Sequence, residues 1–197
     1  MLVGALADAG ADQAAITEAI ASLDVGASVS FEKVKRSGIG ATKYRVAVQE
    51  TKAHRHLTPI IRMIEKANIA DPAKRNAIAI FRRLGEAEAA VHQVPIEKVH
   101  FHEVGAADSI ADIVGTAVAL DSLEVETLIS SPLNVGSGTV RTEHGLLPVP
   151  APATARLLTG VPVYARGPAL ELHGVLVVLA RHRVRPERGQ LDAVAAA

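Results

Sequence analysis

The chain has 197 residues, of which 49% are hydrophobic, so it can bury a substantial core as one large domain or two small ones. Its 21 lysines and arginines balance 21 aspartates and glutamates, and this neutrality argues against nucleic acid or an acidic membrane surface as a partner. Because there is no cysteine, disulfides, thiolate metal sites, iron–sulfur clusters and a cysteine nucleophile are excluded.

Segments that would direct the chain to a membrane are not evident in the sequence. No run reaches the length of about 18 apolar residues that a transmembrane helix needs. The first basic residue is Lys33, and the residues before it include Asp8, Asp12 and Glu18, a pattern unlike a secretory signal. We therefore expect a cytoplasmic protein.

Residues 1–50 predict two helices followed by a β-hairpin. An apolar helix over residues 1–9 would end at Gly10, and Asp12 would cap the second helix. Hydrophobic residues alternate with polar ones over residues 28–50, interrupted by a Ser-Gly-Ile-Gly turn, which is typical of a hairpin with one solvated face. The basic residues of this segment either meet an anionic ligand or form a solvated outer face: Lys33, Lys35, Arg36, Lys43 and Arg45.

Two further helices are predicted between residues 58 and 92. Thr58-Pro59 is a plausible cap and first turn for an isoleucine-rich helix, preceded by the pair His54 and His56. Asp71-Pro72 begins a longer helix that runs to about His92. Glu88 and His92 are four residues apart and could pair on its surface. The expected buried stripe of this helix is Ile78, Phe81, Leu84, Ala87 and Val91.

The densest group of polar side chains lies in residues 99–115, VHFHEVGAADSIADIVG. If residues 99–104 form a strand, His100 and His102 point to one face and Phe101 and Glu103 to the other. Gly105 and Ala106 would make a turn. The Ser-Ile-Ala-Asp spacing then predicts a helix start at Ser109 or Asp108, with Asp108 and Asp112 on one side of the helix unless Asp108 is its cap.

Imidazole and carboxylate donors together suit a divalent transition metal such as zinc, copper, iron or nickel. The spacing matches no standard zinc pattern, since there is no HExxH motif and no cysteine pair. The alternative is that the histidines are half-exposed polar residues of a strand and that the aspartates cap a helix. The residues alone leave both interpretations open.

We predict a mixed α/β fold, with a small mixed sheet and helices packed on it. The helix after the turn, up to residue 123, is apolar on nearly every side and is therefore expected to be buried. A strand over residues 127–135 would complete a strand–helix–strand unit. Such units favour parallel sheets, with ligands at the carboxyl ends of the strands, where the polar group of residues 100–112 would lie.

The last third of the chain has weaker signals. A loop at Gly136 and Gly138 could offer backbone N–H groups to a phosphate, although it lacks the P-loop and GxGxxG patterns. His144 precedes an extended proline-rich segment, after which we expect a short helix over residues 152–158 and a strand over residues 161–165. Residues 173–197 lack patterning and are expected to be weakly ordered.

Several stretches resemble the LarC family. They are HFHEVGAADSIADIVG at residues 100–115, HGLLPVPAPAT at residues 144–154, RHL at residues 55–57 and FRRLGEAEAAVH at residues 81–92. The similarity covers roughly residues 1–172, and two long motifs in the right order make it specific. The family is the nickel insertion protein of lactate racemase cofactor maturation.

The resemblance implies a CTP-dependent enzyme that inserts nickel into pyridinium-3,5-bisthiocarboxylic acid mononucleotide to make the nickel-pincer nucleotide. On the matching positions, we expect His100, His102, Asp108 and Asp112 to hold nickel. We expect His144 or Glu103 to accept protons. Arg55 and His56 are second choices among the matching polar positions. Arg55, Gly136 and Gly138 are the expected contacts of the nucleotide.

The resemblance also implies that this chain is a partial one. The family's first strand would precede residue 1, and its CTP-using C-terminal domain is not represented. We thus expect a LarC-like N-terminal domain over residues 1–172 and a divergent tail over residues 173–197, with a separate C-terminal-half chain or a homo-oligomer as possible completions. The alternatives are a non-catalytic module that binds a divalent metal, or an inactive fragment of the family.

Overall fold

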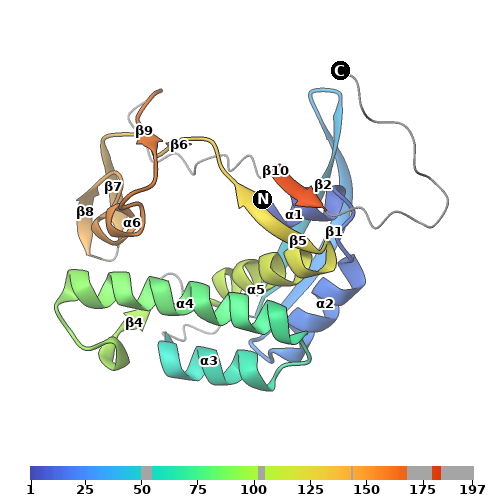
Figure 1. Ribbon diagram of the computed structural model, residues 1–197, viewed down its shortest axis with the longest axis horizontal. Coiled ribbons are helices and arrows are strands. Elements are labelled where there is room, and N and C mark those ends of the chain that lie inside the picture. The colour runs from blue at the N-terminus through green and yellow to red at the C-terminus, as the bar shows by residue number, and fades with distance from the viewer. Residues whose placement is uncertain (50–54, 102–104, 143, 168–178, 183–197) are drawn as a thin grey trace.

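The computed structural model describes residues 1–49, 55–101, 105–142, 144–167 and 179–182, and it confirms the mixed α/β class. Figure 1 shows a helical main body and a smaller lobe that stands over one end of the longest helix. In the part of the chain that the structure describes, no helix is long and apolar enough to cross a bilayer. The helices of the main body are α1 (Leu2–Asp8), α2 (Gln13–Ser22), α3 (Leu57–Lys66), α4 (Asp71–His92) and α5 (Ala107–Ser122).

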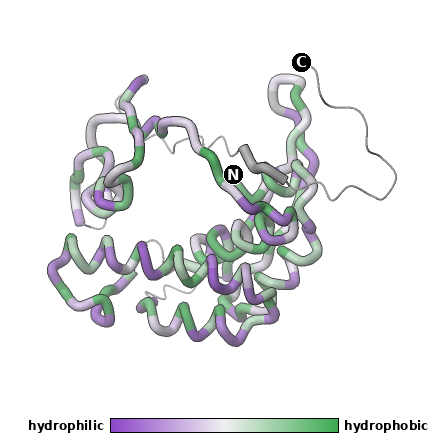
Figure 2. The backbone as a smooth tube through the Cα atoms, viewed as in Figure 1, coloured by the Kyte–Doolittle hydropathy of each residue, from purple (hydrophilic) through white to green (hydrophobic). Residues whose placement is uncertain are grey.

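Helix α5 is the centre of the core, as the apolar sequence after the turn predicts. It contacts α1, α2 and α4, and Ile110, Ala111 and Val114 on it are fully buried. Phe81 of α4 and Phe101 meet edge to face beside it, with ring centroids 6.4 Å apart. The tube of α4 alternates between hydrophilic and hydrophobic residues in Figure 2, as expected for a helix with one buried face.

The N-terminal elements form as the sequence predicts. The Asp12 carboxylate caps α2 by accepting hydrogen bonds from the N–H groups of Ala14 and Ala15. Strands β1 (Ala27–Arg36) and β2 (Ile39–Val48) pair antiparallel over their whole length. The turn between them places Ser37 and Gly38 at positive φ, as a two-residue hairpin requires.

Helix α1 lies against β2 so closely that only glycine fits at the contact. A Cβ on Gly4 would lie 2.6 Å from the Thr42 carbonyl oxygen. Beside this contact, Lys33 Nζ lies 2.8 Å from Asp8 Oδ1, and the Thr42 hydroxyl donates to the same oxygen. Arg45 pairs with Glu32 on the hairpin. Lys33 and Arg45 therefore have carboxylate partners, which favours the interpretation of a solvated face for these two residues.

Two of the predicted helix starts are wrong by a residue or two. Helix α3 begins at Leu57 with His56 as its N-cap, so Thr58 is inside the helix. Helix α5 begins at Ala107, and its N-cap Ala106 makes no side-chain bond. In both cases the chain enters the helix directly from an extended or turn segment fixed by tertiary contacts.

The buried stripe of α4 is confirmed in its centre and wrong at its end. Phe81 and Ala87 are buried, whereas Val91 is 38% exposed. The helix has exactly the predicted span, but its last turns extend past α5 toward the lobe, so Val91 lines a cavity there. The buried positions of α4 instead include the small residues Ala73, Ala77 and Gly85.

The predicted parallel strand–helix–strand unit is wrong. Strand β4 (His100–Phe101) pairs antiparallel with β3 (Arg55–His56). Strand β5 (Val125–Ile129) pairs antiparallel with β10 (Leu179–His182), so the strands on either side of α5 belong to different sheets. The described strands form two-stranded sheets, because each strand has one described neighbour. Apart from β10, the predicted weakly ordered tail at residues 173–197 lies outside the described residues.

The lobe is built from short elements. Strands β6 (Leu133–Asn134) and β9 (Val163–Tyr164) pair in parallel, and β7 (Thr139–Thr142) and β8 (Gly145–Pro148) form a hairpin. The short helix α6 (Pro152–Leu157) follows as predicted and contacts α4. A single 3₁₀ turn, η1 (Ile96–Lys98), links α4 to β4.

Candidate functional site

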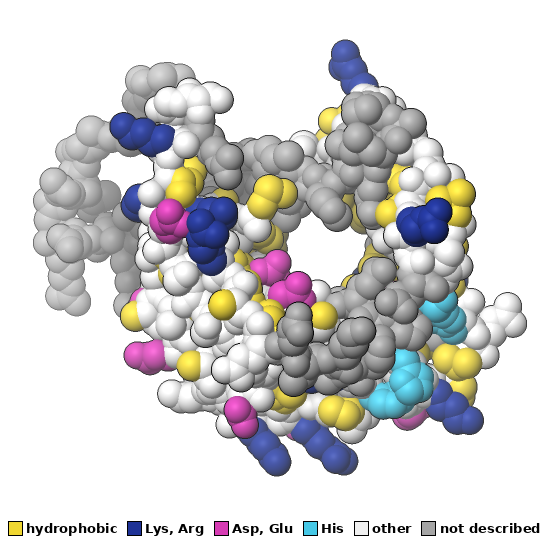
Figure 3. All heavy atoms as spheres, turned by 180° about the vertical axis from the view of Figure 1, so that it is seen from behind, with side chains coloured by type: hydrophobic (Ala, Val, Ile, Leu, Met, Phe, Trp, Pro, Cys, Tyr) yellow, Lys and Arg dark blue, Asp and Glu magenta, His cyan; other side chains and the backbone are white. Residues whose placement is uncertain are grey.

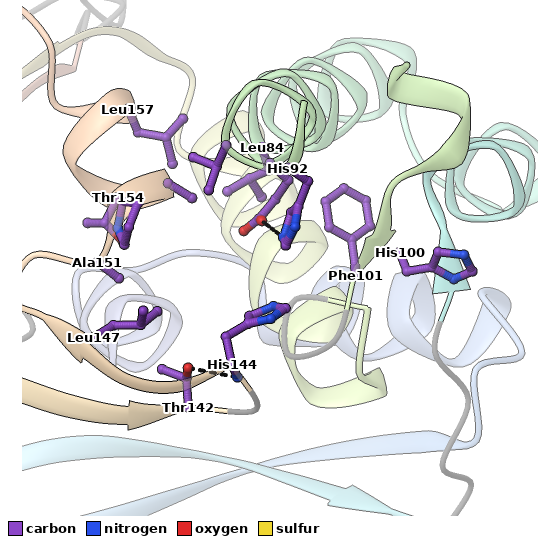
Figure 4. Close-up of a pocket in the computed structure, with 14 residues that line it drawn as sticks. Leu84, His92, His100, Phe101, Thr142, His144, Leu147, Ala151, Thr154 and Leu157 are labelled. Carbon is purple, nitrogen blue, oxygen red and sulfur yellow. Dashed lines mark hydrogen bonds and ion pairs between the residues drawn. The ribbon is translucent and has the colours of Figure 1, made fainter. Parts of the chain in front are cut away.

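A cavity of about 380 Å³ lies where the end of α4 meets the lobe (Figure 4). This volume is within the range of small-molecule sites in proteins. Its walls are mainly apolar and come from α4, the β7–β8 hairpin and α6, including Leu84, Val91, Leu147, Ala151, Thr154 and Leu157. The polar side chains at the cavity are three imidazoles, two threonine hydroxyls and one carboxylate: His92, His100, His144, Thr142, Thr154 and Glu88.

Two of these imidazoles come from distant parts of the sequence. His92 at the end of α4 and His144 between β7 and β8 have ring centroids 4.9 Å apart, with their planes tilted by 51°. Glu88, one turn before His92, places its Oε2 atom 3.4 Å from His92 Nε2. The backbone N–H of His144 donates to the Thr142 hydroxyl, which helps to fix this turn. Figure 4 shows His92 and His144 facing each other.

A second histidine pair lies on the other side of Phe101. The rings of His56 and His100 have centroids 3.9 Å apart. His56 Nδ1 lies 2.9 Å from the Val99 carbonyl oxygen, and a carbonyl can only accept, so Nδ1 carries the proton of this bond. In Figure 4 the ring of His100 points away from His92 and His144. The antiparallel pairing of β3 with β4 is what brings residues 56 and 100 together.

Arg55 braces the turn that precedes α5. Its guanidinium donates to the Gly105 carbonyl oxygen over 3.1 Å. A Cβ on Gly105 would lie 2.7 Å from the Phe101 carbonyl oxygen and 3.2 Å from the backbone nitrogen of Arg55. The glycine predicted as a turn residue is therefore required by a close approach of two backbones. This contact links the RHL segment to the central stretch.

The two aspartates lie on one side of the first turns of α5, as their spacing predicts. Partial burial raises the pKa of the Asp112 carboxyl, the N-terminal ammonium group opposes this rise, and the charge of Asp108 adds to it. The pKa of the Tyr44 hydroxyl is also raised, by burial and by the charge of Asp112. Tyr44 donates a hydrogen bond to the Ala111 carbonyl oxygen at 3.4 Å. The surroundings of Asp112 thus disfavour the charged form of its carboxyl group.

The described part of the predicted metal site is not complete by itself. Within residues 1–49, 55–101, 105–142 and 144–167, no three histidine, aspartate or glutamate side chains are placed to hold a metal ion together. His100, Asp108 and Asp112 therefore do not form a three-ligand site. His102 and Glu103 lie outside the described residues, and the predicted ligand set stays a prediction. In Figure 3, histidines gather at one end of the visible face, and acidic side chains lie apart from them near the central opening.

The predicted phosphate loop has well-defined geometry. Gly136 and Gly138 both have positive φ, which explains the choice of glycine. The Gly136 N–H is already donated to Asn134 Oδ1 at 3.2 Å. The Gly138 carbonyl accepts from Val149 N–H, so the loop is tied to the hairpin. A phosphate would have to displace the side chain of Asn134 to reach the Gly136 amide.

Sequence reasoning did not assign a site role to His92 or Glu88. The available signal was the four-residue spacing of Glu88 and His92, which identifies a pair on one helix face. That spacing does not identify His144 as the neighbour of the pair. His144 joins them only because the β7–β8 hairpin and α6 pack over the end of α4. No local motif encodes that contact.

The described residues form helices packed around short sheets and two imidazole pairs, one of them beside the Glu88 carboxylate. Imidazole and carboxylate are donor types that suit a divalent transition metal. Comparison with known proteins identifies the family. The chain belongs to the nickel insertion protein family, whose model matches residues 1–176.

Several relatives have names that state what they act on. A protein of Desulfitobacterium hafniense, named pyridinium-3,5-bisthiocarboxylic acid mononucleotide nickel insertion protein, is 47% identical over 84% of this chain and 42% of its own length. A Geobacillus kaustophilus protein of the same name is 44% identical over 87% of this chain and 44% of its own length. A Geotalea uraniireducens protein named for nickel insertion is 50% identical over 83% of this chain and 43% of its own length.

The chain spans less than half the length of these relatives, as the resemblance to a longer family implies. No solved structure matches the chain.

Proposed function

We propose that this chain is the nickel-handling part of an enzyme that inserts nickel into pyridinium-3,5-bisthiocarboxylic acid mononucleotide, giving the nickel-pincer nucleotide used by lactate racemase. The observation that carries the proposal is the family match over residues 1–176, together with relatives named for this reaction. The imidazole-lined cavity supports it, since imidazole suits nickel. We further propose that the protein works in the cytoplasm.

The residues that would take part are those of the central stretch and its neighbours. We propose that His100, His102, Asp108 and Asp112 capture nickel. Glu103 and His144 would accept the protons that ligands release when a metal binds. The structure adds His56, whose Nδ1 is bonded to a backbone carbonyl, leaving its Nε2 atom to face His100 or a metal ion.

The contacts of the nucleotide would be Arg55, Gly136 and Gly138. The Arg55 guanidinium has five N–H donors, one of which is used on Gly105, and it suits a phosphate. The resemblance implies that insertion depends on CTP. The glycine loop fits a triphosphate poorly, because the Gly136 N–H is donated to Asn134 Oδ1.

A non-catalytic module that binds a divalent metal for a partner is the second candidate. Its support is the pair of histidine clusters in a chain that covers less than half of its relatives. The partner would be a separate chain that corresponds to their C-terminal half.

The test is an insertion assay with nickel chloride, the mononucleotide and CTP, read as activation of apo-lactate racemase. The chain is assayed alone and with the C-terminal half of the Desulfitobacterium relative. Product from either mixture supports nickel insertion. No product from either, with nickel bound by the chain, favours the metal-binding module, and no nickel binding at all identifies an inactive fragment.

A further inference from the structure

His92 and His144 are the feature of the cavity that the predicted ligand set does not explain. They come from α4 and from the β7–β8 turn, which are 52 positions apart in the sequence (144 against 92). Both line the same cavity, with centroids 4.9 Å apart and planes tilted by 51°. A solvated histidine does not need a second imidazole beside it. The pairing of His92 with His144 therefore requires a chemical explanation.

The separation of the two rings fits a metal ion bound between them. With metal–nitrogen bonds of about 2.1 Å, two imidazoles on adjacent coordination positions have ring centroids roughly 4.5–5 Å apart. The 4.9 Å separation of His92 and His144 falls in that range. The other pair, His56 and His100, is closer at 3.9 Å and is tighter than this arrangement allows. The geometry therefore distinguishes the two pairs.

Glu88 completes the arrangement without binding the metal. Its Oε2 atom lies 3.4 Å from His92 Nε2, a contact that restrains the orientation of the imidazole. A carboxylate behind a metal-binding histidine is the usual way in which proteins orient the ring and raise its basicity. Glu88 is half-buried, with 26% of its side chain exposed, which restricts its motion.

We propose that His92 and His144 together hold the nickel ion at the point of transfer, with Glu88 as a positioning residue. His144 is then a metal ligand, and Glu103 keeps the role of proton acceptor. This inference rests on the proposed function. Nickel(II) with nitrogen and oxygen donors is tetragonal and paramagnetic, and two imidazoles on adjacent positions leave the remaining positions to water. The two thiocarboxylate sulfurs of the substrate displace these waters as anions, and no oxidation or reduction is involved.

A two-ligand site suits a protein that must give its metal away. Among the described residues no third histidine or carboxylate is placed to bind the same ion, so the site holds nickel less tightly than a closed cage of ligands would. The apolar walls formed by Leu84, Val91 and Leu147 limit the water that competes with the sulfurs. The cavity has room for the ring that carries them.

The first experiment is a calorimetric titration of nickel chloride into the 197-residue chain and its variants. The double variant His92→Ala/His144→Ala should lose at least about 100-fold in affinity at this site, since both ligands are gone. The comparison variant is His56→Ala/His100→Ala, which removes the histidine pair at the shorter separation. It should lose nickel capture at the central stretch and keep the site of His92 and His144. Glu88→Gln should weaken binding about 10-fold, because it alters only the support of His92.

A second measurement does not depend on the variants. Nickel broadens the proton signals of nearby groups, so the methyl signals of Val91 and Leu147 should broaden first, while those of the buried core residue Ile16 should not. A His92/His144 double variant whose nickel isotherm is identical to that of the wild type, or broadening that leaves Val91 and Leu147 unaffected, would overturn the proposal. So would a wild-type chain that binds no nickel.

The insertion assay separates this proposal from the one on which it rests. If the wild-type mixture makes no product but the His92/His144 variant loses its nickel, the site stands and the insertase function fails. If the wild-type mixture makes product and the variant does so equally well, the transfer site is wrong while the insertase function stands.

Discussion

The environment of Asp112 disfavours the charged form of its carboxyl group. It lies on a helix among buried neighbours, Ala111 and Val114, and faces Asp108 one turn earlier. Desolvation and the neighbouring carboxylate both favour the protonated form, which is why the pKa of Asp112 is raised. Carboxylates in such positions are often functional, because a site needs them in spite of their cost. This supports its proposed role in metal capture.

Replacing Asp112 by asparagine should make the protein more stable at neutral pH. Because the folded-state pKa is raised, the folded protein binds the proton more tightly, and the stability from that proton is present below the unfolded pKa of about 3.9. It is lost as the pH rises through the raised folded pKa. Asp112→Asn keeps a neutral side chain and avoids this loss. Asp112 is exposed and solvent screens its charge, so the gain should be less than about 1 kcal/mol.

The measurement is urea unfolding of both proteins from pH 3 to pH 7. The variant and the wild type should unfold at similar urea concentrations near pH 3 and diverge as the pH rises through the raised pKa. A variant that is less stable than the wild type at pH 7 would show that the carboxylate has a stabilising partner. Asp121→Asn, near the other end of α5, is the control for removing one charge from the same helix.

At the scale of elements, the packing of α1 on β2 depends on Gly4. Helix propensity alone predicts that Gly4→Ala stabilises α1 by about 1 kcal/mol. The added Cβ would lie 2.6 Å from the Thr42 carbonyl oxygen, so backbone must move, and we expect a net loss on the order of 1–2 kcal/mol. Ala5→Gly at the exposed position next to it measures the propensity term by itself. A stabilised Gly4→Ala protein would mean that α1 shifts freely on the strand.

Elements with local chemical signals were predictable from the sequence, and their pairings were not. Asp12 before α2, Asp71-Pro72 at α4 and Pro152 at α6 each fix a helix start through capping or a preset φ angle. The partner of a strand has no such local signal. Strands β4 and β5 flank a buried helix, as a parallel unit would require, yet β3 and β10 pair with them.

The candidate site likewise has one part that the sequence predicts and one part that it does not. The stretch around His100 was recognisable because its polar residues are close together in the sequence. The contact of His92 with His144 depends on how the lobe packs on α4, and that packing is set by the summed fit of many side chains. Only the Glu88–His92 half of that cluster has a helical spacing that sequence reasoning could find.

At the scale of the whole molecule, the main body and the lobe differ in how they are stabilised. The buried apolar side chains among the described residues all lie between Val3 and Ala119, in the main body. Among the described residues of the lobe, the hydrophobic residues Leu146, Val163 and Tyr164 are 66%, 44% and 47% exposed. A lobe with so little buried surface depends on its contact with α4 for its position.

Nickel should therefore act as a cross-link between the two parts. An ion bound to His92 and His144 joins α4 to the β7–β8 hairpin, and at 100 times its dissociation constant it stabilises the bound state by about 2.7 kcal/mol. Hydrogen exchange followed by mass spectrometry should show slower exchange in β7, β8 and the last turns of α4, with α2 unchanged. The His56→Ala/His100→Ala variant should show the same protection, and the His92→Ala/His144→Ala variant should show none. Protection confined to β3, β4 and the start of α5 would instead place the ion at the central stretch, where His100, Asp108 and Asp112 lie, and leave the lobe uncoupled from the metal.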